Sequence, residues 1–204
     1  MASTSRDRAK AERYESLLRE SARLFAERGF AGVSLEELGA AVGVSGPAVY
    51  RHVSGKQALL GALLVRVSED LVAGGIGVAE ATPEGIDRMR ALIRFHVDFA
   101  LGNADVIRVQ DREIPHLSDD DHAEVRRLQR TYIGLWMQTL ALLRPGSEAE
   151  LRLRVQAGFG LINSTPHSTT AAARSDAATA GVLAAMAEAA LLAPPDRARR
   201  RSSE

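Results

Sequence analysis

Four side chains that can donate hydrogen bonds to phosphate stand close together in this sequence, and they are Tyr50, Arg51, His52 and Lys56. Three small residues come just before them, namely Gly46, Pro47 and Ala48. A helix with small side chains at its start can enter the major groove of DNA, and donors near its end can hold phosphates. The segment 46–52 therefore predicts a DNA recognition helix. The competing interpretation is a solvent-facing helical turn on an ordinary small α domain.

Capping residues predict the helix that precedes this segment. Ser34 stands three residues before Glu37. This is the spacing of a capping box, in which hydroxyl and carboxylate each bond a free backbone N–H group, and Val33 and Leu38 flank it as a hydrophobic staple. A helix is therefore expected directly after Ser34. It ends before Gly43, which can adopt the positive φ of a tight turn.

The recognition helix and the helix after it have caps of their own. Ser45 can cap the recognition helix. Its first turn tolerates Pro47, because the N–H that proline lacks has no helical partner there. Ser54 and Gln57 repeat the capping-box spacing and predict a third helix from near Gly55. The pattern is helix, turn, helix, followed by a third helix.

Spacing also predicts which face of the recognition helix is buried. Val49 and Val53 are four residues apart, so they share one face of the helix. They are expected to pack against the preceding helix and turn. Tyr50 and Arg51 then lie on the opposite, outward face.

The same residues carry a resemblance to a known family. The stretch GVSGPAVYRHVSGKQALL resembles the DNA-binding signature of the TetR family of transcriptional regulators, and the similarity spans about residues 12–64. The resemblance implies phosphate contacts by Tyr50, His52 and Lys56. It also implies that the recognition helix starts at residues 46–48.

Base reading is expected from few groups. Residues 46–48 offer apolar contact suited to thymine methyls, and Arg51 is the candidate donor to a guanine. Ser34 and Ser45, at the two helix starts, complete the expected DNA-binding set. Some members of the family read bases with an Arg in the preceding helix. The matching position here is Glu36, and DNA repels an acid.

The composition is typical of an all-α globular protein. Of 204 residues, 46% are hydrophobic and 25% are charged, the formal net charge is zero, and there is no Cys. Helix formers dominate and β-branched alternation is nearly absent, which favours an all-α fold of about nine helices. No apolar signal segment or membrane-length apolar run is present, so a cytoplasmic protein without membrane contact is expected. With no net charge, DNA binding requires basic residues gathered on one face.

Three parts are expected along the chain. They are a helix-turn-helix DNA-binding domain over residues 1–55, an effector-binding and dimerisation domain over 56–193, and a flexible basic tail over 194–204. Gly74, Gly75 and Gly77 predict a break in the helix that starts near Gly55. The polar stretch 163–175 predicts a loop.

The last two expected helices, about 147–165 and 176–192, predict a homodimer. They are rich in Gly and Ala, and the second carries a single acid, Glu188. So apolar a pair needs a partner, and two copies form a four-helix bundle. The resemblance implies the same, because TetR-like proteins dimerise through their last two helices. A dimer places two reading heads about 34 Å apart and matches a palindromic operator.

Helices in the middle of the chain are apolar on several sides, which is typical of helices in a bundle centre or around a cavity. The candidate effector-binding residues are Met89, Phe95, His96, Phe99, Gln110, Arg112, Tyr132 and Trp136. Ordinary core packing is the competing interpretation of each. Since few are titratable, the expected effector is largely apolar, such as an acyl chain, a lipid-derived thioester or a hydrophobic antibiotic. The resemblance implies a repressor that leaves its operator when the effector binds.

Catalysis, metal binding and a cofactor are not expected. The sequence has no nucleophile elbow, phosphate loop or helical His-x-x-x-His pair. The acids at 119–121, near His116 and His122, are interpreted as a helix cap because no second ligand cluster accompanies them. Two alternatives to an effector-controlled repressor stay open. One is a DNA-binding dimer without effector control, and the other is a dimeric interaction protein that has lost DNA binding.

Overall fold

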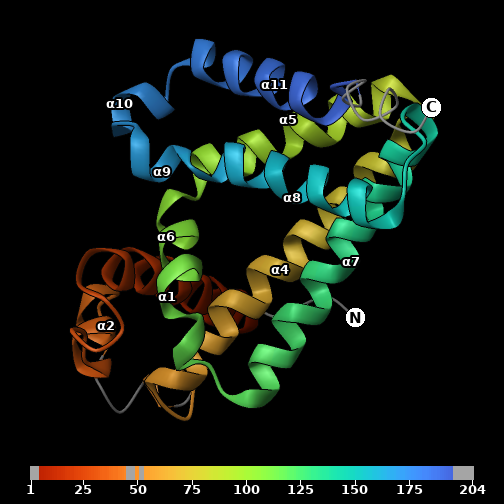
Figure 1. Cartoon of the computed structure of the whole chain (residues 1–204). Helices are drawn as coiled ribbons and strands as arrows, with labels where there is room; N and C mark the ends of the chain where they lie inside the picture. Colours follow the sequence, from red (N-terminus) through yellow and green to blue (C-terminus); the bar gives the residue numbers. More distant parts are fainter. Residues whose placement is uncertain (1–4, 45–48, 51–52, 195–204) are drawn as a thin grey trace, which may run out of the picture.

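The computed structural model of the chain describes residues 5–44, 49–50 and 53–194. Every element in this described part is a helix, which confirms the all-α class (Figure 1). The elements are α1 (Ser5–Arg28), α2 (Leu35–Ala41), α4 (Lys56–Ala81), α5 (Ile86–Gly102), α6 (Ala104–Glu113), η1 (Ile114–His116), α7 (Asp119–Leu143), α8 (Glu148–Asn163), α9 (Thr165–Ser168), α10 (Ala171–Arg174) and α11 (Ala177–Leu192).

Two hydrophobic clusters organise these helices. The first gathers α1, α2 and the first half of α4, with Val106 and Val109 of α6 packed against them. The second gathers α5, α8, α11 and the second half of α7, with Trp136 and Met89 fully buried at its centre. Because α4 and α7 lie side by side and supply residues to both clusters, they tie the two regions into one body (Figure 1).

The predicted break in α4 is wrong, because the helix runs continuously from Lys56 to Ala81. The glycines instead allow side chains to approach the helix closely. A Cβ atom at Gly74 would collide with Cζ of Phe95, and one at Gly75 would lie 2.7 Å from Cε2 of Tyr132. In a helix, glycine can mark a close contact as well as an end.

Another segment differs from expectation. The predicted loop over 163–175 contains two single-turn helices, α9 and α10. The Thr170 hydroxyl caps α10 by accepting from the Ala173 N–H at 3.2 Å. Single turns of this kind carry too short a pattern to be recognised by periodicity.

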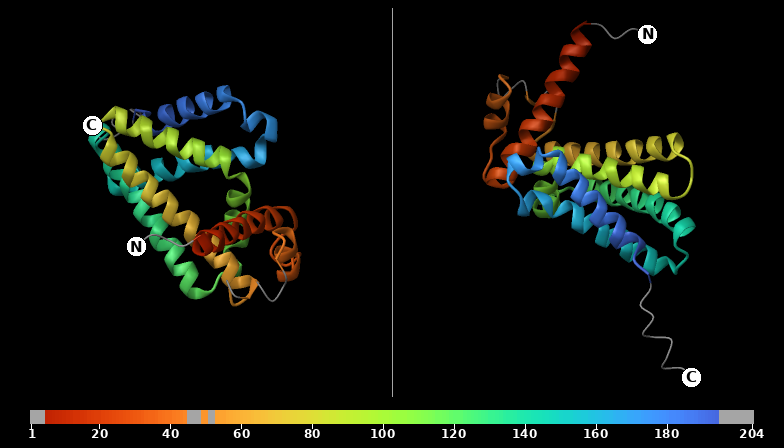
Figure 2. Two further views of the ribbon diagram at one scale, coloured as in Figure 1. Left: turned by 180° about the vertical axis from the view of Figure 1, so that it is seen from behind. Right: turned by 90° about the horizontal axis from the view of Figure 1, so that it is seen from above.

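Helix α6 connects the two regions. It packs on α1 on one side and on α9 on the other, and in Figure 1 it stands between the lower and upper groups of helices. Viewed from above, α1 and α2 project to one side of the larger group (Figure 2). This placement makes α6 a direct link between the N-terminal helices and the C-terminal ones.

Candidate DNA-binding head and effector site

Helix α2 starts with the predicted capping box. The Ser34 hydroxyl accepts from the Glu37 N–H at 3.2 Å, and the Ser34 N–H donates to Oε2 of Glu37 at 2.8 Å. This second bond, with the Ser34 hydroxyl and Arg28, lowers the pKa of the Glu37 carboxyl. The staple is also present, since Val33 and Leu38 are both buried. The start of α2 is therefore fixed by side chains as well as backbone.

The turn after α2 is tight for a visible reason. Gly43 has φ of 68°, in the left-handed region that glycine tolerates best. A Cβ atom at Gly39 would lie 2.7 Å from Cγ2 of Val49 and 3.0 Å from the Val44 carbonyl oxygen. Val44 and Val49 therefore pack closely onto α2.

The described part of the expected recognition helix has the predicted orientation. Val49 is fully buried and Val53 is 8% exposed, whereas Tyr50 is 55% exposed. An exposed tyrosine beside two buried valines leaves its hydroxyl free to meet a partner outside the chain. Six of the predicted DNA-binding residues lie outside the described residues, and they are Ser45, Gly46, Pro47, Ala48, Arg51 and His52.

Lys56 was expected to bind phosphate, and its ammonium also makes contacts within the chain. Its ammonium donates to the carbonyl oxygens of Phe30 and Val33, both at 2.7 Å, and lies 4.5 Å from the centre of the Phe30 ring. His116 stacks on the same ring, with centroids 4.9 Å apart. Two of the three ammonium protons thus fasten the loop before α2 to the start of α4.

The capping box predicted from Ser54 and Gln57 is wrong. The N-cap residue of α4 is Gly55, and it receives no side-chain hydrogen bond. The Gln57 amide instead donates to the His116 carbonyl oxygen at 3.0 Å. A long-range partner therefore competes successfully with the local cap, and it joins α4 to η1.

The candidate effector residues include a cluster of stacked rings between α5, α7 and α8. His96, Tyr132 and Trp136 are almost fully buried. Phe159, which sequence reasoning did not select, packs on all three, with centroid distances of 4.5 Å to His96, 5.5 Å to Tyr132 and 4.9 Å to Trp136. Its position on the same helix face as Val155 and Ile162 was visible in the sequence and could have included it.

His96 is the polar centre of this ring cluster. Its Nε2 lies 3.2 Å from Oδ1 of Asn163, and its Nδ1 lies 3.3 Å from the Tyr132 hydroxyl. Burial lowers the pKa of His96 to about 4, and burial likewise raises the pKa of Tyr132. Both groups are therefore neutral at pH 7, and the cluster is a polar but uncharged interior.

The remaining effector candidates lie in different places. Met89 is fully buried in the second core, Phe99 stacks near His96, and Phe95 contacts Gly74. Gln110 is half-buried on α6, and no hydrogen bond joins it to the described part of the chain. These residues keep the status of candidates.

Arg112, another candidate, is bonded within the chain. Its Nη2 donates to the carbonyl oxygens of Phe25 and Ala26, at 2.7 and 2.9 Å. Those carbonyls belong to the last turn of α1, where free acceptors and the helix dipole attract a cation. The guanidinium therefore binds the N-terminal region from α6. Sequence spacing alone could not reveal a partner so far away in the chain.

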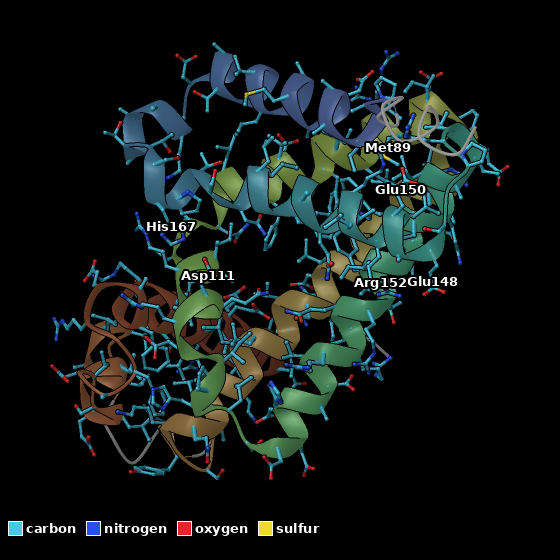
Figure 3. The ribbon with its side chains drawn as sticks, viewed as in Figure 1. Met89, Asp111, Glu148, Glu150, Arg152 and His167 are labelled. Atoms are coloured by element: carbon cyan, nitrogen blue, oxygen red, sulfur yellow. The ribbon has the colours of Figure 1, made fainter. Side chains whose placement is uncertain are left out.

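Two residues that precede Arg112 on α6 contact the C-terminal region. Nε2 of His167 on α9 lies 2.9 Å from Oδ2 of Asp111, and the two side chains face each other across the gap between α6 and α9 (Figure 3). Nη2 of Arg108 donates to the Pro166 carbonyl oxygen at 2.5 Å. Helix α6 is thus fastened to α9 by residues 108 and 111, and to α1 by residue 112.

A surface cleft of about 470 Å³ also lies between the two regions. Its walls come from α1, α4, α10 and the junction of α5 and α6, including Leu18, Arg19, Val67, Val106 and Arg174. The volume is within the usual range for small-molecule sites. Because four distant segments build it, no local pattern in the sequence predicted it.

Two family models match the chain. The model of bacterial regulatory proteins of the tetR family matches residues 17–63, and the model of the tetracyclin repressor-like C-terminal domain matches residues 82–167. The first match contains α2, the tight turn and Lys56, and the second contains the ring cluster up to Asn163. The chain belongs to the TetR family. It is therefore a transcriptional regulator and not an enzyme, as the sequence indicated.

Individual relatives agree with this assignment. This TetR-family chain is 33% identical over 88 residues to the HTH-type transcriptional activator FasR of Mycolicibacterium smegmatis, a match that covers 43% of the chain and 40% of FasR. The match thus covers less than half the length of this curated relative.

Solved structures show the same fold. A TetR-family regulator from Bordetella parapertussis 12822 has a TM-score of 0.78 at 19% identity, over 89% of this chain and 95% of that one. The regulator FadR of Bacillus subtilis, solved in complex with stearoyl-CoA, has a TM-score of 0.70 at 14% identity, over 88% of this chain and 98% of that one. In the described part of this TetR-family chain, no helix is both long and apolar enough to cross a membrane.

Proposed function

We propose that this chain is a cytoplasmic, homodimeric repressor that binds a palindromic operator and leaves it when a small, largely apolar effector binds. The observation that carries the proposal is the double attachment of α6, to α1 through Arg112 and to α9 through Asp111. We assign residues 1–55 to DNA binding, 56–193 to effector binding and dimerisation, and 194–204 to a basic tail.

DNA binding is proposed through the outward face that bears Tyr50. Tyr50, His52 and Lys56 are assigned to phosphates, and Arg51 to a guanine edge in the major groove. The exposure of Tyr50 supports this assignment. The partial use of the Lys56 ammonium by two carbonyls leaves Lys56 with a second task, which is to hold the head onto α4.

Dimerisation is proposed through the outer faces of α8 and α11. Three large apolar side chains stand open there, since Leu153 is 66%, Val182 is 58% and Met186 is 51% exposed. Small exposed residues surround them on α11, namely Ala178, Gly181, Ala185 and Ala189. Small side chains let two helices approach closely, and large apolar ones gain most from leaving water. Two such pairs form a four-helix bundle.

Effector control is proposed through the ring cluster and α6. The cluster reaches the end of α8 through the contact of His96 with Asn163, and α9 follows directly. Helix α9 holds α6 through Pro166 and His167, and α6 holds α1. A ligand that moves the rings can therefore shift the reading head. By linkage, DNA must weaken ligand binding by the same factor.

The chemistry of the effector is proposed to be acyl-like. The ring cluster is uncharged and aromatic, which suits an apolar ligand. The similarly folded FadR of Bacillus subtilis binds stearoyl-CoA, an acyl thioester. The cleft of about 470 Å³ between the two regions is the competing location for a ligand.

Selection of bound sequences from a random DNA pool tests the proposal. We expect a palindrome whose half-sites lie about 34 Å apart. Arg51→Ala should cost roughly 1–3 kcal/mol of binding and relax the preference at one position per half-site. An equal loss on every sequence would assign Arg51 to phosphate alone. Recovery of no preferred sequence would support the interaction protein instead.

One observation favours a second candidate, transcriptional activation. The relative FasR, which shares 33% identity over the matched region, is named an activator. Both readings use the same operator binding and differ in where the operator lies relative to the promoter. In-vitro transcription from the selected operator, with and without the protein, separates them by the sign of the change.

A further inference from the structure

The ring cluster contains one hydrogen-bond donor too many. The Asn163 side-chain oxygen can only accept, so Nε2 of His96 carries the proton that meets it at 3.2 Å. Nδ1 of His96 is then an acceptor, and the Tyr132 hydroxyl donates to it at 3.3 Å. In the chain Tyr132, His96 and Asn163, the hydroxyl proton and the imidazole proton therefore each have an acceptor.

Trp136 stands outside this chain of bonds. Its ring is fully buried, and its indole N–H has no hydrogen-bond partner in the described part of the protein. Burial raises the pKa of the Tyr132 hydroxyl, and the Trp136 indole, acting as a weak donor to this hydroxyl, lowers that pKa by less, but the two groups fall short of hydrogen-bond geometry. A buried donor without an acceptor is costly, and native proteins rarely keep one without a purpose.

The surroundings of this N–H limit what can satisfy it. His96 is neutral, and the rings in contact with Trp136 are those of His96, Tyr132 and Phe159, none of them charged. A carboxylate or phosphate placed here would lose its hydration and meet no cation. A neutral oxygen acceptor, such as a carbonyl, matches the single free donor without burying a charge.

Phe159 offers a way to the donor. Among the four rings in mutual contact, His96, Tyr132 and Trp136 are buried, whereas Phe159 is partly exposed. Rotation of the Phe159 side chain would open the faces of the other three rings to a ligand.

We propose that the Trp136 N–H recognises a neutral carbonyl-type oxygen of an ester, thioester or ketone within an otherwise apolar effector, which takes the place of the Phe159 ring. The inference rests on the proposed function for the existence of an effector. It adds the polar feature that the effector carries. An effector of pure hydrocarbon, or one whose buried end is a carboxylate, does not fit this site.

Matched probes test the proposal. One series consists of straight-chain methyl ketones, and the other replaces each carbonyl oxygen by a methylene group. Calorimetry gives the ratio of dissociation constants within each pair, for the wild type and for Trp136→Phe. The ketone preference of the wild type is then divided by that of Trp136→Phe, and this division removes the effect of the different hydration of the probes. We expect the wild type to prefer the ketone by about fivefold to tenfold more than the variant does, which corresponds to one neutral hydrogen bond.

Tyr14→Phe is the control, because it removes an aromatic hydroxyl beside the first hydrophobic cluster, away from the candidate effector residues. It should preserve the ketone preference. The same preference in Trp136→Phe as in the wild type, or its loss in Tyr14→Phe alone, overturns the proposal. Failure of both probe series to bind the wild type overturns it as well.

A second measurement needs no variant. Trp136 is the only tryptophan among the 204 residues, so the protein labelled with ¹⁵N has a single indole N–H resonance. Ketones should move it downfield and the methylene analogues should not. Equal shifts from both series contradict the proposal. Gel shifts with the operator separate the two inferences, because ketone binding without DNA release contradicts effector control and leaves the Trp136 contact standing.

Discussion

The glycines of α4 give the sharpest test of the packing. Gly75 and Gly77 lie two residues apart in the same continuous helix. A Cβ at Gly75 would meet Cε2 of Tyr132 at 2.7 Å and Cδ2 of Leu135 at 3.0 Å, whereas one at Gly77 would meet nothing within 4 Å. Gly75→Ala and Gly77→Ala are therefore chemically identical changes in two different surroundings.

The magnitudes follow from these distances. Replacement of glycine by alanine inside a helix stabilises by about 0.5–1 kcal/mol, and this gain applies to both variants. At position 75, the contact is shorter than an optimal carbon–carbon distance by about 0.8 Å. Tyr132 is held between His96 and Phe159, so it has little room to retreat. Overpacking of this kind costs about 1–3 kcal/mol.

Thermal and denaturant unfolding at one fixed protein concentration measure the difference, because dimerisation links stability to concentration. We expect Gly77→Ala to be slightly more stable than the wild type and Gly75→Ala to fall below Gly77→Ala by about 1–3 kcal/mol. Subtraction of one variant from the other removes the common helix gain. Equal stability of the two variants would refute the close contact of α4 with Tyr132.

Three further predictions concern His96, Lys56 and Arg112. Because burial lowers the pKa of His96 to about 4, only the unfolded chain takes up its proton between about pH 6.5 and 4, so the free energy of unfolding should fall by about 3 kcal/mol as the pH drops through this window. Denaturant titrations at both pH values should show a smaller fall in His96→Gln, and an identical fall would argue against a neutral buried imidazole. Lys56→Met should lower the free energy of unfolding by about 1–3 kcal/mol, because two carbonyl oxygens lose their donor, and it should reduce the salt slope of DNA binding by about one unit per half-site. Loss of stability with an unchanged slope would make Lys56 purely structural. Arg112→Met should accelerate hydrogen exchange in the last turn of α1 by about fivefold, from loss of about one net hydrogen bond, while the exposed Arg126→Met serves as control. Equal exchange in both variants would disprove the attachment of α6 to α1.

Local chemistry was the part of the fold that sequence could predict. The capping box of Ser34 and Glu37, the positive φ of Gly43 and the buried face of Val49 and Val53 all involve residues within a few positions of each other. Such patterns depend on backbone geometry that is the same in every protein. They were sufficient to identify the helix-turn-helix.

Long-range partners account for the failures. The Gln57 amide donates to the His116 carbonyl and not to a local cap, and Arg112 donates to carbonyls of α1 that its spacing did not reveal. Gly75 allows close approach by Tyr132, although glycine more often marks the end of a helix. In each case the deciding group is more than fifty positions away, so only the folded chain brings it near.

The candidate effector site was predicted in part. Apolar helices correctly indicated the burial of His96, Tyr132 and Trp136, because periodicity reports which face turns inward. Periodicity does not report which atoms meet. The pairing of His96 with Asn163 and the missing acceptor of Trp136 depend on distances that no spacing rule contains.

Asp111 and Arg112 are consecutive, yet they hold α9 and α1 on different sides of α6. Neighbouring side chains on a helix point about 100° apart. Turning α6 around its long axis would therefore displace both attachments at once. A twist of this short helix would thus be transmitted to α1 and to α9 together.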